Sequence, residues 1–259
     1  MKIGVSIRPV FPLLRDFQEF AESLFAEFEG LKDVELHTDD LDGLLIYLLN
    51  ISRKFNLKYS IHCPHMYSQQ KVNFCSKNKK DIEKAEFWLK KSINFAKQIK
   101  AKNIVIHPDI PKNCNKEEAL NIIEDHIKNN LKYLKNQNIL IENMPGKDYS
   151  LSTPEEFLNF LKRFKSKVGI CWDVGHEIIR LKKQEFLFPK KLKSKIKEIH
   201  LSGILNYKDH RSLTHSNLKL RELMKILKDL NYNGAIIFEI VTKNPIEIIK
   251  SKYKLEKFY

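Results

Sequence analysis

The sequence predicts an α/β fold, an eight-stranded (β/α)8 TIM barrel that residues 1–259 form as a single domain. Three observations support this prediction. Short apolar or β-branched runs alternate with helical patterns from end to end, as in a parallel sheet with helical crossovers. Eight such runs are present, the number that closes a barrel, and a length of 259 residues is typical of that fold. No linker or low-complexity tract divides the sequence.

The predicted strands are short, as expected for strands that helices cover on both sides of a parallel sheet. They span residues 2–7, 34–37, 58–63, 103–107, 139–143, 168–173, 196–202 and 235–241. The sequence Asn-Tyr-Asn-Gly at positions 231–234 is a turn signal before the last of them.

Helical patterns fill the intervals between these strands. The fifth helix should start in Ser-Thr-Pro-Glu-Glu at positions 152–156, which combines an N-cap, a proline and an acidic first turn. The sixth, at 185–195, is the weakest because it is short, very basic and interrupted by Pro189. The fourth shows one apolar stripe at three- and four-residue steps, formed by Leu120, Ile123, Ile127, Leu131 and Leu134.

The formal net charge is +14, which suggests an anionic partner such as nucleic acid or a sugar phosphate. Most of this excess is lysine, whereas dedicated phosphate recognition usually relies more on arginine. Lysines spread over helix faces equally suit a solvated surface, so the charge leaves both interpretations open. The first residues carry Arg8 within their apolar stretch and make a poor signal peptide. Because no apolar run approaches the length of a membrane span, we expect a cytoplasmic protein without a membrane partner.

Histidines and carboxylates follow the apolar residues of six predicted strands. In a barrel of this kind, the carboxyl ends of the strands form the mouth that holds the active site. Three carboxylates that lie close together without a partner would be very costly, and a shared cation removes that cost. The sequence therefore predicts a divalent metal site at the mouth, built from His62, His107, Glu142, Asp173, His200 and Glu239.

These segments resemble the xylose isomerase-like barrel superfamily, and within it endonuclease IV, the family-2 apurinic/apyrimidinic endonucleases. The resemblance covers nearly the whole chain, strand by strand. Its pieces are H-x-P after the third strand, I-H-P after the fourth, I-E-N after the fifth, W-D-V-G-H after the sixth, H-L after the seventh and F-E on the eighth.

The resemblance implies a site with three zinc ions, for which Mn²⁺, Co²⁺ or Mg²⁺ are alternatives. It assigns His62, His107 and Glu142 to the first ion, and His176 and His210 to the third. It implies hydrolysis of a phosphodiester at abasic sites in DNA, with Glu142 and Glu239 as catalytic residues. The second ion would be held by Glu142, Asp173, His200 and Glu239.

Two departures from the endonuclease pattern leave an alternative open. Lys208 stands where the aspartate of a D-x-H motif is expected before His210, so two ions remain possible instead of three; Asp209 or His215 are conceivable substitutes. The second strand ends in an acidic segment with Glu35, whereas the endonuclease carries a basic, aromatic segment there. This second feature resembles the sugar branch of the superfamily. A divalent-metal-dependent sugar or sugar-phosphate isomerase or epimerase is therefore the alternative prediction.

Overall fold

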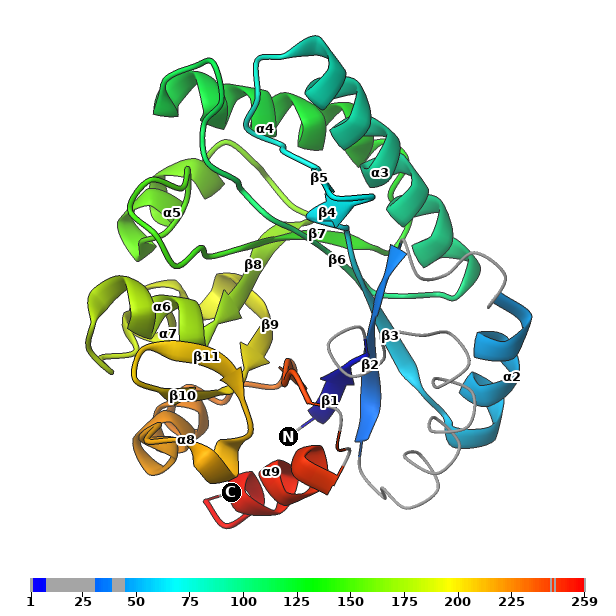
Figure 1. The fold of residues 1–259 in the computed structure, drawn as a ribbon. Coiled ribbons are helices and arrows are strands. Elements are labelled where there is room, and N and C mark those ends of the chain that lie inside the picture. The colour runs from blue at the N-terminus through cyan, green and yellow to red at the C-terminus, as the bar shows by residue number, and fades with distance from the viewer. Residues whose placement is uncertain (1, 8–30, 39–44, 243, 245, 259) are drawn as a thin grey trace.

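A computed structural model describes residues 2–7, 31–38, 45–242, 244 and 246–258. Within them, eight parallel strands form a closed barrel in the order β1-β12-β9-β8-β7-β6-β3-β2, which confirms the predicted TIM barrel. Helices surround the strands (Figure 1). The stretch with Arg8, the segment after the first strand, and Asp39 and Asp40 lie outside the described residues.

The strands of the barrel match the eight predicted runs to within a few residues at each end. They are β1 (Lys2–Ser6), β2 (Leu31–His37), β3 (Lys58–His62), β6 (Asn103–Ile106), β7 (Asn138–Glu142), β8 (Val168–Asp173), β9 (Ile196–Leu201) and β12 (Ala235–Phe238). The helices are α2 (Leu45–Phe55), α3 (Lys79–Gln98), α4 (Lys116–Leu131), α5 (Pro154–Leu161), α6 (Val174–Leu181), α7 (Leu187–Leu192), α8 (Leu220–Asp229) and α9 (Ile246–Glu256).

Helix starts follow the local signals in the sequence. At α5, the Thr153 side chain accepts from the Glu156 backbone N–H and Glu156 caps Thr153 in return, with Pro154 in the first turn, as predicted. The apolar stripe of α4 packs Ile123 and Ile127 into the core between helix and barrel.

One helix was not predicted. The sequence led us to expect a single weak helix at 185–195, but α6 begins directly after β8, and α7 follows as a short separate helix. The Asp173 side chain caps α6 by accepting from the His176 backbone N–H at 2.6 Å. The helix therefore begins without a linker, and His176 lies in its first turn.

Strand register brings the strand ends to one level. In the parallel ladders, His37 pairs with His62, and Asp173 pairs with His200. Alternate residues of each strand point into the barrel, so inward side chains stack in layers. One layer is the apolar cluster of Val105, Leu140 and Cys171. The polar layer of the mouth lies at the carboxyl ends of the strands.

Two small hairpins extend from the carboxyl ends of the strands. The pair β4 (Met66–Tyr67) and β5 (Gln70–Lys71) follows β3, and the pair β10 (Gly203–Leu205) and β11 (Lys208–Arg211) follows β9. The second hairpin packs on α6. No helix among the described residues is long and apolar enough to cross a membrane.

Candidate metal centre

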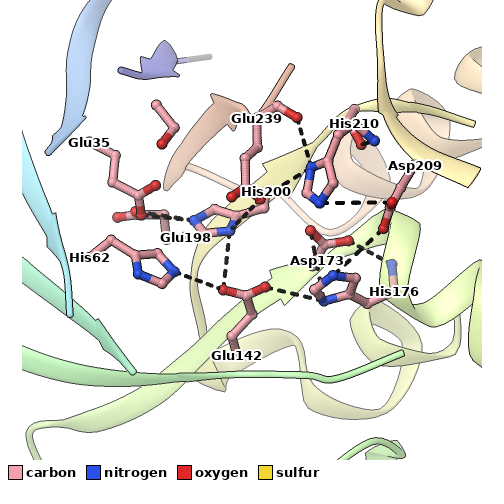
Figure 2. A network of polar contacts seen from close by, with 12 residues as sticks. Glu35, His62, Glu142, Asp173, His176, Glu198, His200, Asp209, His210 and Glu239 are labelled. Carbon is pink, nitrogen blue, oxygen red and sulfur yellow. Dashed lines mark hydrogen bonds and ion pairs between the residues drawn. The ribbon is translucent and has the colours of Figure 1, made fainter. Parts of the chain in front are cut away.

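The side chains predicted from the strand ends converge at the mouth of the barrel, with Glu142 between several histidines (Figure 2). At the mouth, three groups have ligand atoms that lie within 4.8 Å of one another inside each group, the spacing that a shared metal ion requires, and the first two groups share Glu142. They are His62, His107 and Glu142; Glu142, Asp173, His200 and Glu239; and His176, Asp209 and His210.

The first group meets at one carboxylate oxygen. Glu142 Oε2 lies 3.3 Å from His62 Nε2 and 3.1 Å from His107 Nε2. The rings of the two histidines meet edge to face, with centroids 4.7 Å apart. Both nitrogens therefore point at the same oxygen, as two ligands of one ion would.

The second group contains buried polar atoms without a hydrogen-bond partner. His200 Nδ1 lies 3.4 Å from both Glu142 Oε2 and Glu239 Oε2. Both His200 Nδ1 and Glu239 Oε2 are buried without a hydrogen bond. Unsatisfied buried groups of this kind are rare in proteins and need an explanation. A cation between them satisfies the nitrogen and the oxygens together, so these residues fit a metal ion.

The third group contains Asp209, not Lys208. His176 Nε2 lies 3.6 Å from Asp209 Oδ2, and His210 Nε2 lies 3.8 Å from Asp209 Oδ1. Lys208 is exposed on the hairpin. His210 adopts a left-handed backbone conformation with φ of 55°. This conformation turns the chain at His210 and interrupts the regular alternation of side chains along the strand. Asp209, and not the residue at position 208, therefore has its carboxylate beside the two histidines.

Gly175 allows this hairpin to approach α6. A Cβ atom at Gly175 would lie 3.0 Å from Asp209 Cβ and 3.1 Å from Asp173 Oδ1, closer than ordinary van der Waals contact. The glycine in the W-D-V-G-H segment is therefore explained by close packing against the third group.

Four histidines use their second ring nitrogen to hold the ring in place. His62 Nδ1 donates to the Cys63 carbonyl at 2.8 Å. His176 Nδ1 donates to the Asn143 carbonyl at 2.9 Å, and His210 Nδ1 donates to the Glu239 carbonyl at 3.1 Å. These bonds orient the rings so that each Nε2 faces a carboxylate of its own group. In metal sites, ligating histidines almost always have such a partner, so the geometry fits ligands better than plain ion pairs.

The fourth histidine has its partner below the mouth. His200 Nε2 lies 3.0 Å from Glu35 Oε2 and 3.9 Å from Glu198 Oε1, and neither carboxylate is more than 1% exposed. The Asn103 amide donates to the second oxygen of Glu198 at 2.8 Å. This buried polar layer turns His200 Nδ1 up toward the mouth. Sequence reasoning placed Glu35 at a strand end and missed Glu198, because an inward carboxylate two residues before His200 has no local signal.

Opposing effects set the ionisation of the carboxylates. Burial alone would raise the pKa of Glu142, but the nearby His107 and His200 hold it well below its usual range. Burial raises the pKa of Asp173 to about 6, although His176 opposes the shift. The centre therefore contains at least one firmly ionised carboxylate in a buried position, which needs a cationic partner.

The histidines show the complementary effect. Burial alone would lower the pKa of His62, but Glu35 and Glu142 raise it to about 9. For His176, burial is again outweighed, and Asp173 and Glu142 raise its pKa to about 10. Without metal the imidazoles hold protons, and a metal ion must displace them.

The remaining histidines divide into rim and structural residues. His37 stacks on His62 at 4.6 Å, and His65 stacks on His107 at 5.2 Å, so both border the mouth. His215 lies on the surface and pairs with Glu247. Of the two conceivable substitutes for the missing aspartate, Asp209 therefore lies beside His176 and His210, and His215 does not. His126, inside α4, pairs with Glu86.

The mouth encloses a cavity of about 230 Å³. His62, His107, Glu142, His176, His210 and Glu239 all contribute to its lining. Asp109 and Lys71, whose Oδ1 and Nζ atoms lie 3.4 Å apart, form part of the rim together with Tyr149. The cavity therefore has the candidate metal ligands at its base and a rim of mixed charge.

Sequence comparison relates the chain to known proteins over most of its length. Residues 24–255 match the family described as xylose isomerase-like TIM barrel. The uncharacterized protein MJ1188 of Methanocaldococcus jannaschii is 30% identical over 95% of this chain and 92% of its own length. A probable endonuclease 4 of Metamycoplasma arthritidis is 27% identical over 69% of this chain and 68% of its own.

Solved structures share the fold. A D-tagatose 3-epimerase-like protein has a TM-score of 0.82 and 24% identity over 100% of this chain and 97% of its own. The IolI protein with a bound zinc atom has a TM-score of 0.78 and 15% identity, covering 100% and 99%. A family-2 AP endonuclease from Brucella melitensis has a TM-score of 0.79 and 12% identity, covering 95% of both chains. At these identities the likeness establishes the barrel.

Proposed function

The chain belongs to the xylose isomerase-like TIM barrel family, and from this premise we propose that it is a metal-dependent phosphodiester hydrolase. One observation carries the proposal: the mouth holds three groups of candidate ligands. A sugar isomerase with one ion needs only the second group. The first group, which adds His62 and His107, and the third, which consists of His176, Asp209 and His210, support an enzyme that binds two or three ions.

Different residues would hold the different ions. Glu142 belongs to both the first and second groups, so it would help to hold both ions. The imidazole nitrogens favour zinc over magnesium, with Mn²⁺ or Co²⁺ as alternatives. When bound, such ions lower the pKa of water and stabilise the charge that develops on a phosphoryl group. Glu239, whose Oε2 faces His200, closes the side of the second group next to the cavity.

We propose DNA with abasic sites as the substrate. The relatives named probable endonuclease 4 support this choice. A cavity of about 230 Å³ has room for a single sugar-phosphate unit and excludes a whole helix. His65, Tyr149 and Lys71 on its rim are then positioned to contact the strand beside the cleaved bond.

The decisive experiment is incision of a duplex with one abasic site. Protein supplied with zinc should cut the duplex, and a chelator should stop the reaction. Elemental analysis of the active protein should find two or three ions per chain. Absence of cleavage with Zn²⁺, Mn²⁺, Co²⁺ and Mg²⁺ alike would rule out the hydrolase.

A sugar or sugar-phosphate isomerase or epimerase is the second candidate. The observation in its favour is that Glu142, Asp173, His200 and Glu239 form a complete site for one ion without the other groups. Glu142 and Glu239 would then pass a proton to and from the carbon next to the carbonyl. Solvent deuterium should enter a ketose, and His62→Ala should leave that exchange intact. The same change should abolish phosphodiester cleavage, so this variant separates the two functions.

A further inference from the structure

A second, larger cavity lies at the opposite end of the barrel. Its volume is about 860 Å³, and residues at the amino ends of the strands, such as Lys2, Lys58 and Ala235, line it. Small-molecule sites usually measure about 300 to 1,000 Å³. This cavity is in that range, whereas the mouth with the metal groups is below it.

The rim of this lower cavity carries a concentrated positive charge. Six exposed lysines line it: Lys2, Lys58, Lys100, Lys102, Lys193 and Lys197. None of them forms an ion pair with a carboxylate in the part of the chain that the structure describes. Asp33 and Glu198 are the two carboxylates in the lining, so the cations outnumber them three to one. Burial raises the pKa of Asp33, and the nearby Lys58, Lys2 and Lys102 oppose this shift. The remaining excess of lysines around a concave surface attracts anions.

The floor is polar and contains unsatisfied buried atoms. Glu198 is 1% exposed and Ser60 is 5% exposed, yet Glu198 Oε1 and Ser60 Oγ lack a hydrogen-bond partner. Asn103 is already occupied, because it donates to Glu198 and accepts from the Asn138 amide at 3.2 Å. Glu198 Oε1 has the His200 Nε2 atom 3.9 Å away, beyond hydrogen-bond distance, and Ser60 is a neighbour of the same carboxylate. A hydroxyl group of a ligand that reaches the floor can therefore donate to this carboxylate or accept from the serine.

We propose that the lower cavity binds a small phosphorylated polyhydroxyl compound of the sugar-phosphate class. Its phosphate contacts the lysine rim, and a hydroxyl group reaches Glu198 and Ser60 on the floor. A nucleic-acid backbone satisfies only the rim, because a polymer lying across the opening does not reach the buried atoms. Glu198 is shared with the layer under His200, but among the described residues the lysine rim has no contact with the metal groups, so the rim can be tested separately from the proposed hydrolase.

Ribose 5-phosphate, inorganic phosphate and ribose are suitable probes for calorimetric titration of the full chain. Ribose 5-phosphate should bind one site with the highest affinity. Lys58→Gln combined with Lys102→Gln should weaken it about tenfold, since two charged contacts at a partly exposed rim are lost. The control is Lys225→Gln with Lys228→Gln, which removes the same charge from the exposed face of α8 and should change the affinity little.

Two further variants assign the binding to this cavity. Ser60→Ala should weaken ribose 5-phosphate but not inorganic phosphate, because only the sugar reaches the floor. His210→Ala, at the metal mouth, should leave the affinity unchanged. The proposal is wrong if ribose 5-phosphate does not bind, if His210→Ala abolishes binding, or if both lysine pairs weaken it equally. Tight binding of single-stranded DNA that depends on Lys58 and Lys102, without binding of ribose 5-phosphate, would assign the surface to a polyanion instead.

Discussion

The two ends of the barrel have opposite chemistry although the same strands form both. At the carboxyl ends, histidines and carboxylates line a cavity of about 230 Å³. At the amino ends, lysines surround a cavity of about 860 Å³. The net charge of +14 therefore does not reflect the local charge at either end of the barrel. The charge concentrated at the lower rim does not support DNA binding at the mouth, where the metal groups themselves carry the argument.

The two ends meet at a buried polar layer. His200 faces the mouth with Nδ1 and contacts Glu35 with Nε2, while Glu198 lies under His200 and also lines the lower cavity. Substitutions at the mouth, in this layer and at the lower cavity should therefore show how much each region contributes to metal binding and to ligand binding.

The largest effect is expected from Glu142→Gln. The change removes a charged ligand from two metal groups, so metal content should fall and activity should drop by more than about 100-fold, beyond the usual cost of losing a residue that only supports a ligand. Elemental analysis and the abasic-site assay measure both. Glu83→Gln, on the exposed face of α3, is the matched control. Full metal content in Glu142→Gln would contradict the assignment, and ribose 5-phosphate binding at the other end should persist.

Asp209→Asn should affect only the third group. The amide oxygen is a poorer ligand than a carboxylate, so the metal count should fall from three to two, with an affinity loss for that ion of at least about 100-fold. Lys208→Gln should leave three ions bound, because Lys208 is exposed on the hairpin and cannot act as a carboxylate ligand. If Lys208→Gln lost the third ion and Asp209→Asn kept it, position 208 and not Asp209 would contribute to the third group, as the motif of the endonuclease family implies.

The sequence predicted the barrel and most of its mouth because both depend on local signals. Strand ends are recognisable where apolar runs stop, and the six residues from His62 to Glu239 follow such runs directly. The sequence did not decide between Asp209 and His215 as the acidic or histidine partner of the third group. The position of the Asp209 side chain depends on the left-handed backbone at His210 and on the close approach to Gly175, which have no local signal in the sequence. Helix α6 was missed because Asp173 is both the last residue of β8 and the cap of the helix.

Glu35→Gln should weaken the metal centre without removing a ligand. His200 would lose its charged acceptor, and changes of this kind cost about 10- to 100-fold in metal affinity. Glu198→Gln is an internal comparison, since Glu198 lies 3.9 Å from His200 Nε2 against 3.0 Å for Glu35, and its effect should be smaller. Competition with a chromophoric chelator measures both affinities. Equal losses in the two variants would show that the layer acts only through packing.

The smallest effect is a change of stability with pH in the metal-free protein. Glu35 and Glu142 raise the pKa of His62 to about 9, and Asp173 and Glu142 raise that of His176 to about 10, against burial that would lower both. Protonation of these rings stabilises the fold fully below their ordinary pKa of about 6.5, and the contribution is lost as the pH rises through 9 to 10.

The thermal midpoint of chelator-treated protein should therefore fall between pH 6.5 and pH 10. Metal-loaded protein should not show this fall, because ligation requires the deprotonated rings and becomes stronger as protons leave. His62→Gln should flatten the slope of the metal-free protein, whereas His215→Gln, on the surface beside Glu247, should leave it unchanged. A slope that is the same with and without metal would place its origin outside the mouth, since the two forms differ only in what the histidines bind.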